Sequence, residues 1–333
     1  MSKIRLGILG TGGMGRHHVG KILASPDADL VALCDMSEEN LRVALDLVAE
    51  QGAEVLETFR DAAEMYRRVE LDGVVIATPH TLHFEHGKQA LEADCHVMME
   101  KPMVTDSDDA HTLADLVEST GKILSVGYNT ACKPAVSRAR DMIRGKELGE
   151  LQMVCGYLLQ DWRNTTAGRW RQEPELSGGG MAYDSGAHLL NTFCWTIESP
   201  VEEVFAYIDN CEKPVDINSI ITVRFMNGVY ATAMIGGNCP SHSSAVTYVL
   251  DDGKIELDGW GGHYIRAWRG DNEIEDLAVS GKDSTPVLNF IDSILGRAEP
   301  AANARHGVIQ SVLMDAIYES ARTGQPARPA ARG

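Results

Sequence analysis

Closely spaced cysteines, long apolar runs and basic residues are all scarce in this sequence. Its seven cysteines stand singly, without a C-x-x-C pair, so neither a disulfide framework nor a structural zinc site is expected. No apolar stretch approaches the roughly 20 residues of a transmembrane helix, and the N-terminal residues lack the pattern of a signal peptide. We therefore expect reduced thiols, no membrane partner and a cytoplasmic location.

Basic residues are outnumbered, with 30 lysines and arginines against 48 acidic residues and a formal net charge of −18. A chain this acidic is poorly suited to bind nucleic acid or an anionic membrane surface, so neither is expected as a partner. Residues 162–172 are a local exception, because they contain three arginines and no acidic residue. The bulk charge therefore does not decide whether a small-molecule substrate is neutral or anionic.

The length of 333 residues exceeds that of one typical compact domain, and the apolar pattern changes near residue 128. Up to that point short apolar runs alternate with amphipathic segments, which predicts an α/β domain with a parallel sheet over residues 1–128. Its strands are expected at residues 4–9, 30–34, 74–77, 96–99 and 123–126, and its helices at 14–24, 37–51, 82–93 and 106–119.

Strand patterns dominate after residue 128, so residues 129–333 are expected to form an α+β domain with a largely antiparallel sheet. A helix is expected at 134–144, followed by strands at 151–159, 201–208, 219–225, 229–235 and 245–250. Asn227-Gly228 between two of these strands is a strong signal for a two-residue hairpin. Apolar residues at helical spacing near the C-terminus predict a last helix at about 303–323.

A glycine-rich loop joins the first expected strand to the first expected helix. The run Gly10-Thr11-Gly12-Gly13-Met14-Gly15 fits G-x-G-x-x-G in the strand-turn-helix context of a doubly wound Rossmann domain. Gly10 permits the tight turn, Gly12 lets the backbone approach a pyrophosphate, and Gly15 allows close helix packing. The helix N-terminus at Gly13 and Met14 offers unpaired N–H groups to phosphates. A dinucleotide site is therefore expected here.

Asp35 follows the second expected strand, 20 residues after Gly15. Its carboxylate can accept hydrogen bonds from ribose 2′- and 3′-hydroxyls, whereas a 2′-phosphate would face a like charge. No lysine or arginine follows closely, since Met36, Ser37 and Glu38 come next. NAD is therefore the expected cofactor, in preference to NADP. The plainer alternative is a glycine-rich turn with Asp35 as a surface cap.

Thr78 and Pro79 follow the expected strand at 74–77, at the edge of the sheet where ligands bind in such folds. His83 comes next, in a series with His80 and His86. A spacing of three spreads these histidines widely around a helix, and no carboxylate-rich site is evident, so no metal is expected. We expect Thr78, Pro79 and His83 to lie beside the cofactor.

Glu100-Lys101-Pro102 ends the expected strand at 96–99, again on the cofactor side. The Lys101 ammonium can hydrogen-bond a substrate hydroxyl and stabilise a developing alkoxide beside a nicotinamide ring. Pro102 makes a cis peptide possible, which would fix the direction of the lysine. We expect Glu100 to be near the cofactor and Lys101 to be catalytic, with an ordinary salt bridge as the alternative.

Residues 177–188 begin with a serine and three glycines and end with Asp184-Ser185-Gly186-Ala187-His188. The glycines let a loop approach a ligand closely, and if a helix follows, Asp184 and His188 lie one turn apart on the same face. A histidine with an ordinary pKa of about 6.5, oriented by a carboxylate, suits general-base catalysis near neutral pH. The alternative is a helix cap and a satisfied histidine.

An aromatic and basic patch precedes these glycines. Indole faces pack against the C–H surfaces of sugars, and guanidinium groups bind hydroxyls, carboxylates or phosphates. The alternative is a buried tryptophan with surface arginines. The residues expected to bind substrate are Trp162, Arg163, Arg169, Trp170 and, after the last strand of the first domain, Tyr128.

These motifs, in this order, resemble the Gfo/Idh/MocA family, which includes glucose–fructose oxidoreductase, inositol dehydrogenase and rhizopine-catabolism proteins. The resemblance covers nearly the whole chain. It rests on the loop at 10–15, Thr78-Pro79 with His83, Glu100-Lys101-Pro102, the glycines at 145–149, the glycines at 178–180 with Asp184 and His188, and the closing helix.

The resemblance implies a Rossmann domain followed by an open mixed sheet that often makes homodimer or homotetramer contacts. It also implies hydride transfer between NAD(P) and a sugar or cyclic polyol. In that scheme His188 removes the hydroxyl proton, Lys101 polarises the oxygen, and Asp184 orients the histidine or binds a neighbouring hydroxyl. Family members often carry arginines after a tyrosine–asparagine step, where this chain has Thr130-Ala131-Cys132.

The primary hypothesis is an NAD-dependent dehydrogenase that oxidises a secondary alcohol on a monosaccharide or inositol. A second possibility within the same chemistry is an enzyme that keeps NAD bound and transiently oxidises a glycoside. A third, of a different class, is a non-catalytic NAD-dependent sensor. The intact set of Lys101, Asp184 and His188 favours an enzyme over a sensor.

Overall fold

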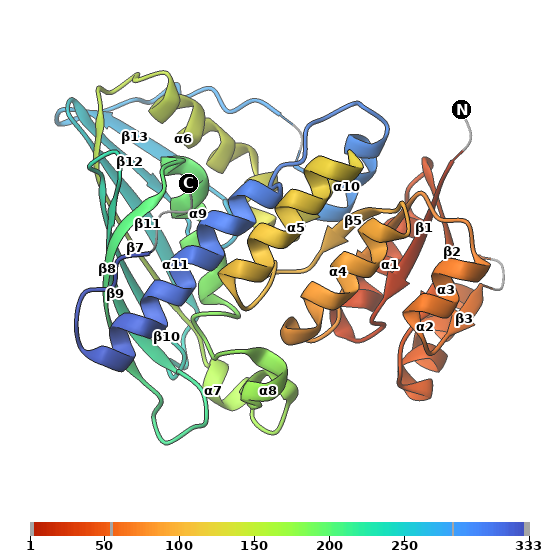
Figure 1. Cartoon of the computed structure of the whole chain (residues 1–333). Coiled ribbons are helices and arrows are strands. Elements are labelled where there is room, and N and C mark those ends of the chain that lie inside the picture. The colour runs from red at the N-terminus through yellow and green to blue at the C-terminus, as the bar shows by residue number, and fades with distance from the viewer. Residues whose placement is uncertain (1–2, 54–55, 282, 330–333) are drawn as a thin grey trace. The chain divides into compact units, whose positions relative to one another are not determined.

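The computed structural model describes residues 3–53, 56–281 and 283–329. The chain divides into two compact units, shown with the whole chain in Figure 1. Unit 1 comprises Met1–Gly127 and Ser284–Gly307, and unit 2 comprises Tyr128–Asp283 and Val308–Gly333.

Unit 1 is built on a six-stranded sheet in the order β3-β2-β1-β4-β5-β6, in which all neighbouring strands are parallel. The order reverses between β1 and β4, and the crevice beyond the carboxyl ends of such strands is where doubly wound sheets bind dinucleotides. The strands are β1 (Ile4–Leu9), β2 (Ala28–Cys34), β3 (Glu57–Phe59), β4 (Gly73–Ile76), β5 (His96–Met99) and β6 (Leu124–Val126).

The helices of unit 1 begin at local caps. Ser37 and Asp106 accept backbone N–H bonds at the starts of α2 and α5, and Asp61 does the same for α3. The helices are α1 (Gly13–Leu23), α2 (Glu38–Glu50), α3 (Ala62–Arg68), the 3-10 turn η1 (His80–Leu82), α4 (His83–Glu92), α5 (Ser107–Thr120) and α10 (Pro286–Ile294).

The α10 segment shows that the sequence division at residue 128 is too simple. Phe290 of α10 is fully buried in one apolar cluster with Leu6 and Ile8 of β1. The backbone N–H of Val126 also donates to the carbonyl of Ala302 at 2.8 Å. The second-domain range 129–333 therefore contains a segment, Ser284–Gly307, that belongs to unit 1, because its apolar face is buried in the parallel-sheet core.

Unit 2 is built on an eight-stranded sheet in the order β14-β13-β12-β11-β7-β10-β9-β8. Only the β7–β10 pair is parallel among its described strand pairs, so the sheet is mixed and largely antiparallel. The strands are β7 (Leu151–Leu159), β8 (Val201–Asp209), β9 (Asn218–Phe225), β10 (Tyr230–Gly236), β11 (Ser243–Leu250), β12 (Gly253–Leu257), β13 (Ile265–Arg269) and β14 (Asn272–Glu273).

Helices cover one face of this sheet, where α6, α9 and α11 lie in Figure 1. The alternation of buried and exposed residues along β9 fits a sheet that is covered on one face only. The helices are the 3-10 turn η2 (Asn129–Cys132), α6 (Pro134–Arg144), α7 (Trp162–Thr165), the 3-10 turn η3 (Trp170–Gln172), α8 (Pro174–Ser177), α9 (Gly186–Ile197) and α11 (Ala304–Thr323), which begins in the last residues of unit 1.

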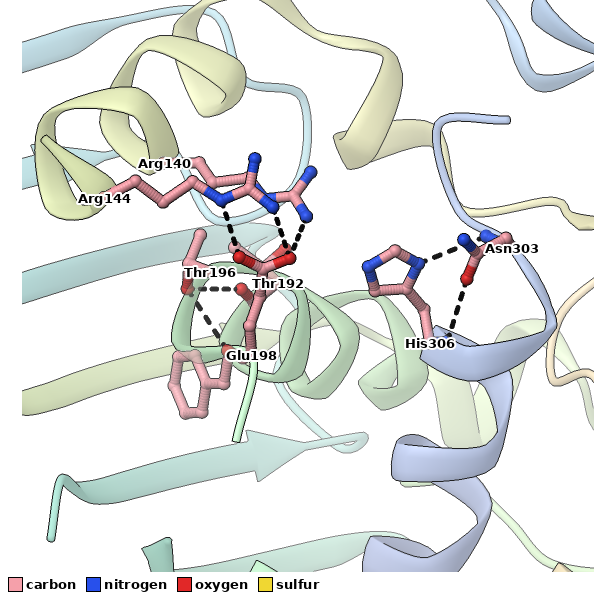
Figure 2. Close-up of polar contacts among 8 residues, drawn as sticks. Arg140, Arg144, Thr192, Thr196, Glu198, Asn303 and His306 are labelled. Atoms are coloured by element: carbon pink, nitrogen blue, oxygen red, sulfur yellow. Dashed lines mark hydrogen bonds and ion pairs between the residues drawn. The ribbon is translucent and has the colours of Figure 1, made fainter. Parts of the chain in front are cut away.

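Charged groups hold the C-terminal end of α9 to α6. The Glu198 carboxylate accepts hydrogen bonds from Arg144 Nε and Nη2 at 2.6 Å each and from Arg140 (Figure 2). The Arg140 guanidinium also lies 4.0 Å from the centroid of the Trp195 ring. In unit 1, Asn303 and His306 cap the start of α11 reciprocally, each accepting a backbone N–H from the other (Figure 2).

Candidate active site

The glycine loop of unit 1 has the shape that a dinucleotide pyrophosphate requires. Gly10 has φ +91°, and a Cβ on it would lie 2.7 Å from the carbonyl of Ala77 after β4. A Cβ on Gly15 would lie 1.9 Å from the carbonyl oxygen of Gly10. Gly12 and Gly13 have no neighbour within 4 Å of such an atom, and the first turn of α1 has no acidic residue. The loop is therefore closed on its sheet side and has space at these two glycines, which fits a bound NAD.

Asp35 is tied to this loop. Its Oδ2 accepts the backbone N–H of Thr11 at 2.7 Å, and its Oδ1 accepts the N–H of Ser37 at 2.8 Å. The carboxylate thus holds the loop while remaining partly exposed. One cation near it in the fold was not evident from the sequence: Arg60, which follows β3, forms an ion pair with Glu38 at 2.9 Å.

His83 links the ends of β4 and β5. It is fully buried, with Nδ1 2.8 Å from the carbonyl oxygen of Pro102 and Nε2 3.0 Å from that of Thr78. Burial lowers the pKa of His83, against the effect of these two hydrogen bonds. His86 Nδ1 lies 3.0 Å from the Thr78 hydroxyl, and burial lowers the pKa of His86 to about 4. Both imidazoles therefore hold the Thr78-Pro79 turn through contacts with Thr78. His83 has no exposed surface in this structure with which to touch a cofactor.

The Glu100-Lys101-Pro102 segment follows β5, and its Lys101-Pro102 peptide is cis. The Glu100 carboxylate lies 2.7 Å from Nε2 of His18, a buried residue of α1. A Cβ on Gly127 would lie 3.2 Å from Glu100, so the carboxylate is held closely by its surroundings. Glu100 thus connects the helix that follows the glycine loop to the segment that carries Lys101.

In unit 2, Asp216 and Tyr318 clamp the loop of three glycines. The buried Asp216 carboxylate accepts the N–H groups of Gly180 at 2.6 Å and Ala182 at 2.8 Å, together with the Tyr318 hydroxyl. Burial raises the pKa of Asp216, although these hydrogen bonds oppose the shift. A Cβ on Gly179 would lie 2.3 Å from the Tyr183 ring, which stacks on Tyr318. The glycines are therefore needed for packing within unit 2.

Asp184 lies in the turn that follows this loop. Its Oδ2 accepts the indole N–H of Trp162 at 2.7 Å and Nε of Arg171 at 3.0 Å. α9 begins at Gly186, so Asp184 lies in the turn directly before the helix that carries His188. These two donors, from α7 and η3, hold the carboxylate in position.

His188 lies in the first turn of α9, whose residues are all buried. Its ring packs edge-to-face against Trp260, with centroids 4.7 Å apart, and against Tyr128, with centroids 6.4 Å apart. The helix is held by Gln310, whose amide donates to the Ala187 carbonyl at 3.0 Å. The position of the imidazole is therefore fixed by helix packing and by aromatic rings.

The residues of the aromatic and basic patch, which are expected to bind substrate, differ in how far they are exposed. Trp162 is buried, so its indole face is unavailable for a sugar and its N–H serves Asp184 instead. The backbone N–H of Arg163 donates to the carbonyl of Gly237 at 2.6 Å. Arg169 is exposed, and Trp170 packs under the guanidinium of Arg171 at 4.6 Å.

Several residues that hold the candidate site segments within unit 1 or within unit 2 could not be identified from the sequence. Trp260 and Asp216 come from loops far from His188 along the chain, and only the Asp-Gly-Trp-Gly-Gly context of Trp260 was a local signal. His18 gave the weaker signal of a polar side chain on the inner face of a helix, and Arg171 was visible only as part of the basic patch.

The parallel sheet and the glycine loop define a dinucleotide-binding protein with a Rossmann domain. Residues 4–128 match the Gfo/Idh/MocA oxidoreductase family with an NAD-binding Rossmann fold, and residues 136–264 match the Gfo/Idh/MocA C-terminal domain. The chain belongs to the Gfo/Idh/MocA family, which confirms the resemblance and the fold class expected from the sequence.

Similar proteins are named as dehydrogenases of sugars and polyols. D-xylose 1-dehydrogenase (NADP(+)) of Haloarcula marismortui is 25% identical, over 92% of this chain and 89% of that protein. Inositol 2-dehydrogenase of Rubrobacter xylanophilus is 25% identical, over 97% of this chain and 92% of that protein. The WlbA dehydrogenase of Bordetella pertussis, solved with NADH and UDP-GlcNAcA, is 25% identical with a TM-score of 0.86, covering 100% of this chain and 99% of that one.

The described residues contain neither a membrane-spanning helix nor a cluster of metal ligands. No helix in residues 3–53, 56–281 and 283–329 is long and apolar enough to cross a membrane. Within the same part of the chain, no group of three or more His, Cys, Asp and Glu side chains is placed to hold a metal ion.

Proposed function

We propose that this protein is an NAD-dependent oxidoreductase that transfers hydride between a secondary alcohol of a sugar or cyclic polyol and the nicotinamide. The observation that carries the proposal is the fixed Asp184–His188 segment, in a chain whose glycine loop fits a dinucleotide. The named activities of the similar proteins, on xylose and on inositol, point to the same substrate class. The three-arginine segment supports no choice between neutral and anionic sugars, since Arg171 is engaged by Asp184.

In the proposed reaction His188 removes the proton of the substrate hydroxyl, and Lys101 polarises the oxygen as negative charge develops on it. Asp184 orients the histidine or binds a neighbouring hydroxyl of the substrate. When bound, NAD supplies the acceptor of the hydride that leaves the carbon. Gly10, Gly12, Gly13, Met14 and Gly15 would hold its pyrophosphate, and Asp35 its adenosine ribose.

The preference for NAD over NADP rests on the Asp35 carboxylate, which is partly exposed beside the glycine loop. A 2′-phosphate at the ribose would face this charge and the carboxylate of Glu38. Arg60, a possible phosphate ligand, is already paired with Glu38. The similar proteins include the D-xylose 1-dehydrogenase named for NADP(+), so the preference is proposed from the residues at these positions and not from the similarity.

The proposed activity is tested with a panel of sugars and cyclic polyols, after any nucleotide that co-purifies has been identified. Formation of NADH with a ring-shaped secondary alcohol supports the proposal. Conversion of a glycoside without NADH formation would indicate instead an enzyme that recycles bound NAD. Binding of NAD without conversion of any compound would favour the sensor.

The role of Lys101 gives a direct prediction. Lys101→Ala should lower kcat for the identified substrate by roughly 10²- to 10³-fold, because the developing alkoxide loses its cation. NAD binding, measured by fluorescence titration, should change little because Lys101 is outside the glycine loop. Lys122→Ala, which removes a cation paired with Asp94 on the same unit, is the control. Unchanged turnover in Lys101→Ala would refute the mechanism.

We also propose that the protein forms homodimers or homotetramers through the sheet of unit 2. The face opposite the helices, here called the open face, carries exposed apolar side chains in register: Tyr207 beside Ile220 and Ile220 beside Met234. A hollow of about 260 Å³ lies on it, lined in part by Cys155 and Tyr157. Exposed apolar patches of this kind mark protein contacts.

All seven cysteines lie among the described residues and are free, which supports the proposal of a reducing, cytoplasmic location.

A further inference from the structure

Trp260 is the partly exposed member of the ring cluster around His188. Tyr128 is 1% exposed and His188 5%, whereas Trp260 keeps an intermediate exposure. The indole packs edge-to-face against the His188 imidazole, with centroids 4.7 Å apart and an interplanar angle of 67°. A substrate whose hydroxyl reaches the imidazole therefore comes within reach of this indole.

The loop that carries Trp260 is held in one conformation. The Asp258 carboxylate accepts the N–H of Trp260 at 2.9 Å, the hydroxyl of Ser244 at 2.9 Å and the N–H of Gly261 at 3.3 Å. Burial raises the pKa of Asp258, but these hydrogen bonds outweigh it and the pKa is lowered. The side chain is thus a charged anchor for the loop.

The glycines on either side of Trp260 fit the loop closely to its surroundings. A Cβ on Gly259 would lie 3.2 Å from the backbone nitrogen of Ala245 on β11. Gly262 has φ +59°, and a Cβ on it would lie 2.7 Å from Cβ of Lys133. The backbone on both sides of the indole is therefore fixed, so the ring can be presented to a ligand with little loss of conformational entropy.

A fixed indole face selects for a particular shape of substrate. The ring of a cyclitol or pyranose presents several C–H bonds on one side, which pack flat against an indole. An open-chain polyol with the same hydroxyls must first be ordered, and its C–H bonds do not lie in one plane. Trp162, the tryptophan expected from the sequence to serve as this surface, is buried and donates to Asp184 instead.

We propose that Trp260 is the specificity-determining residue of this site and selects cyclic over open-chain polyols by packing on the C–H face of the substrate ring. The proposal rests on the proposed function and extends it. Asp258 is a positioning residue, which acts through the backbone of the Trp260 loop.

The test compares myo-inositol and D-glucose with D-glucitol as substrates for the wild type, Trp260→Ala and Trp260→Phe. Trp260→Ala should raise KM for the cyclic compounds by roughly 3- to 10-fold while kcat stays within about twofold, since an aromatic contact contributes to binding and not to proton transfer. Trp260→Phe should recover most of the effect, and KM for D-glucitol should not change. Trp268→Phe, which removes an indole packed under Lys254 and Arg266, is the matched control.

Saturation-transfer NMR on the same probes separates this proposal from the proposed function. The ring C–H protons of myo-inositol or D-glucose should receive saturation from the wild type and lose most of it in Trp260→Ala. Equal saturation in both proteins, or an equal rise in KM for cyclic and open-chain compounds, overturns the role of Trp260. Absence of NADH formation from every compound of the sugar and polyol panel overturns the proposed function, and the NMR comparison then still decides whether Trp260 contacts the ring.

Discussion

Asp35 holds the glycine loop and, in the proposed function, also determines which coenzyme binds. Its carboxylate holds the glycine loop through the N–H of Thr11, and it is placed to discriminate between ribose hydroxyls and a 2′-phosphate. Glu38 follows β2 and Arg60 follows its neighbour β3, and the two side chains form an ion pair. Removal of the Asp35 charge therefore leaves a cation, Arg60, in the same region. In the proposed function, the coenzyme preference therefore depends on a balance among three charged side chains, those of Asp35, Glu38 and Arg60.

Replacement of Asp35 by serine should shift the coenzyme preference toward NADP. Loss of a charged hydrogen bond to the ribose should lower kcat/KM for NAD by roughly 10- to 100-fold, while loss of the like charge should raise kcat/KM for NADP. The ratio of the two values, measured with one substrate, should change by at least about 10²-fold.

Asp46→Asn is the control for this experiment, because it removes an exposed acidic group from α2, the helix that follows Asp35, where Asp46 pairs with Arg42. Its NAD-to-NADP ratio should equal that of the wild type. Comparable use of NADP by the unmodified protein, or an unchanged ratio in Asp35→Ser, would contradict the role given to Asp35.

The predictable residues are those whose role follows from their spacing within a short stretch of sequence. The loop at 10–15 and Asp35 follow from strand, turn and helix spacing within one βαβ segment. Trp260 was not predictable, because its contact with His188 joins residues 72 positions apart in the chain. Trp162 was predicted to contact the substrate, but it is buried. Its burial results from the packing of α7, which the neighbouring residues in the sequence do not reveal.

At the scale of elements, the turn after β4 is supported by two histidines of low basicity. His86 meets the Thr78 hydroxyl at 3.0 Å, and burial, with a smaller contribution from His83, lowers its pKa to about 4. The unfolded chain binds this proton at an ordinary pKa of about 6.5. The stabilising contribution of neutral His86 is therefore complete above about pH 6.5 and is lost as the pH falls toward about 4.

His86→Gln should flatten the acid side of the stability profile. The wild type should lose roughly 2 to 3 kcal/mol of unfolding free energy through this group between about pH 6.5 and about pH 4, and the variant should not. Urea denaturation at several pH values measures the difference. His263→Gln, which removes an imidazole that is 82% exposed, should follow the wild-type profile. Parallel profiles for the wild type and His86→Gln would contradict the assignment.

Elements were predicted well where pattern and caps agree, and poorly where they are short or return from a distance. Strands at 4–9 and 96–99 and the helix at 134–144 coincide with β1, β5 and α6. The three-residue β3 is too short to show a period, and α10 lies in a sequence region assigned to the other domain. α9 begins after Asp184, and the loop that leads into it is held by Asp216, which comes from a different loop.

At the scale of the whole molecule, the net charge of −18 opposes association of two copies unless the contacting surfaces are themselves uncharged. The central row of the open face meets this condition, because it consists of Tyr207, Ile220, Met234, Tyr157 and Ala245 across neighbouring strands. Arg224 is paired with Glu202 on two of these strands, and on the next strand, β12, Lys254 is paired with Glu256. This face is therefore suited to a second copy of the chain.

Ile220→Lys should convert the proposed oligomer to monomers. Each copy in a two-fold contact would place an unpaired ammonium in an apolar interface, which should raise the dissociation constant by at least roughly 10²-fold. Sedimentation velocity over a range of concentrations measures the mass, and circular dichroism checks that the fold is kept. Val279→Lys, at an exposed apolar residue outside the strands, should leave the mass unchanged. A monomeric wild type, or an Ile220→Lys variant with wild-type mass, would show that copies of this protein do not associate through the open face.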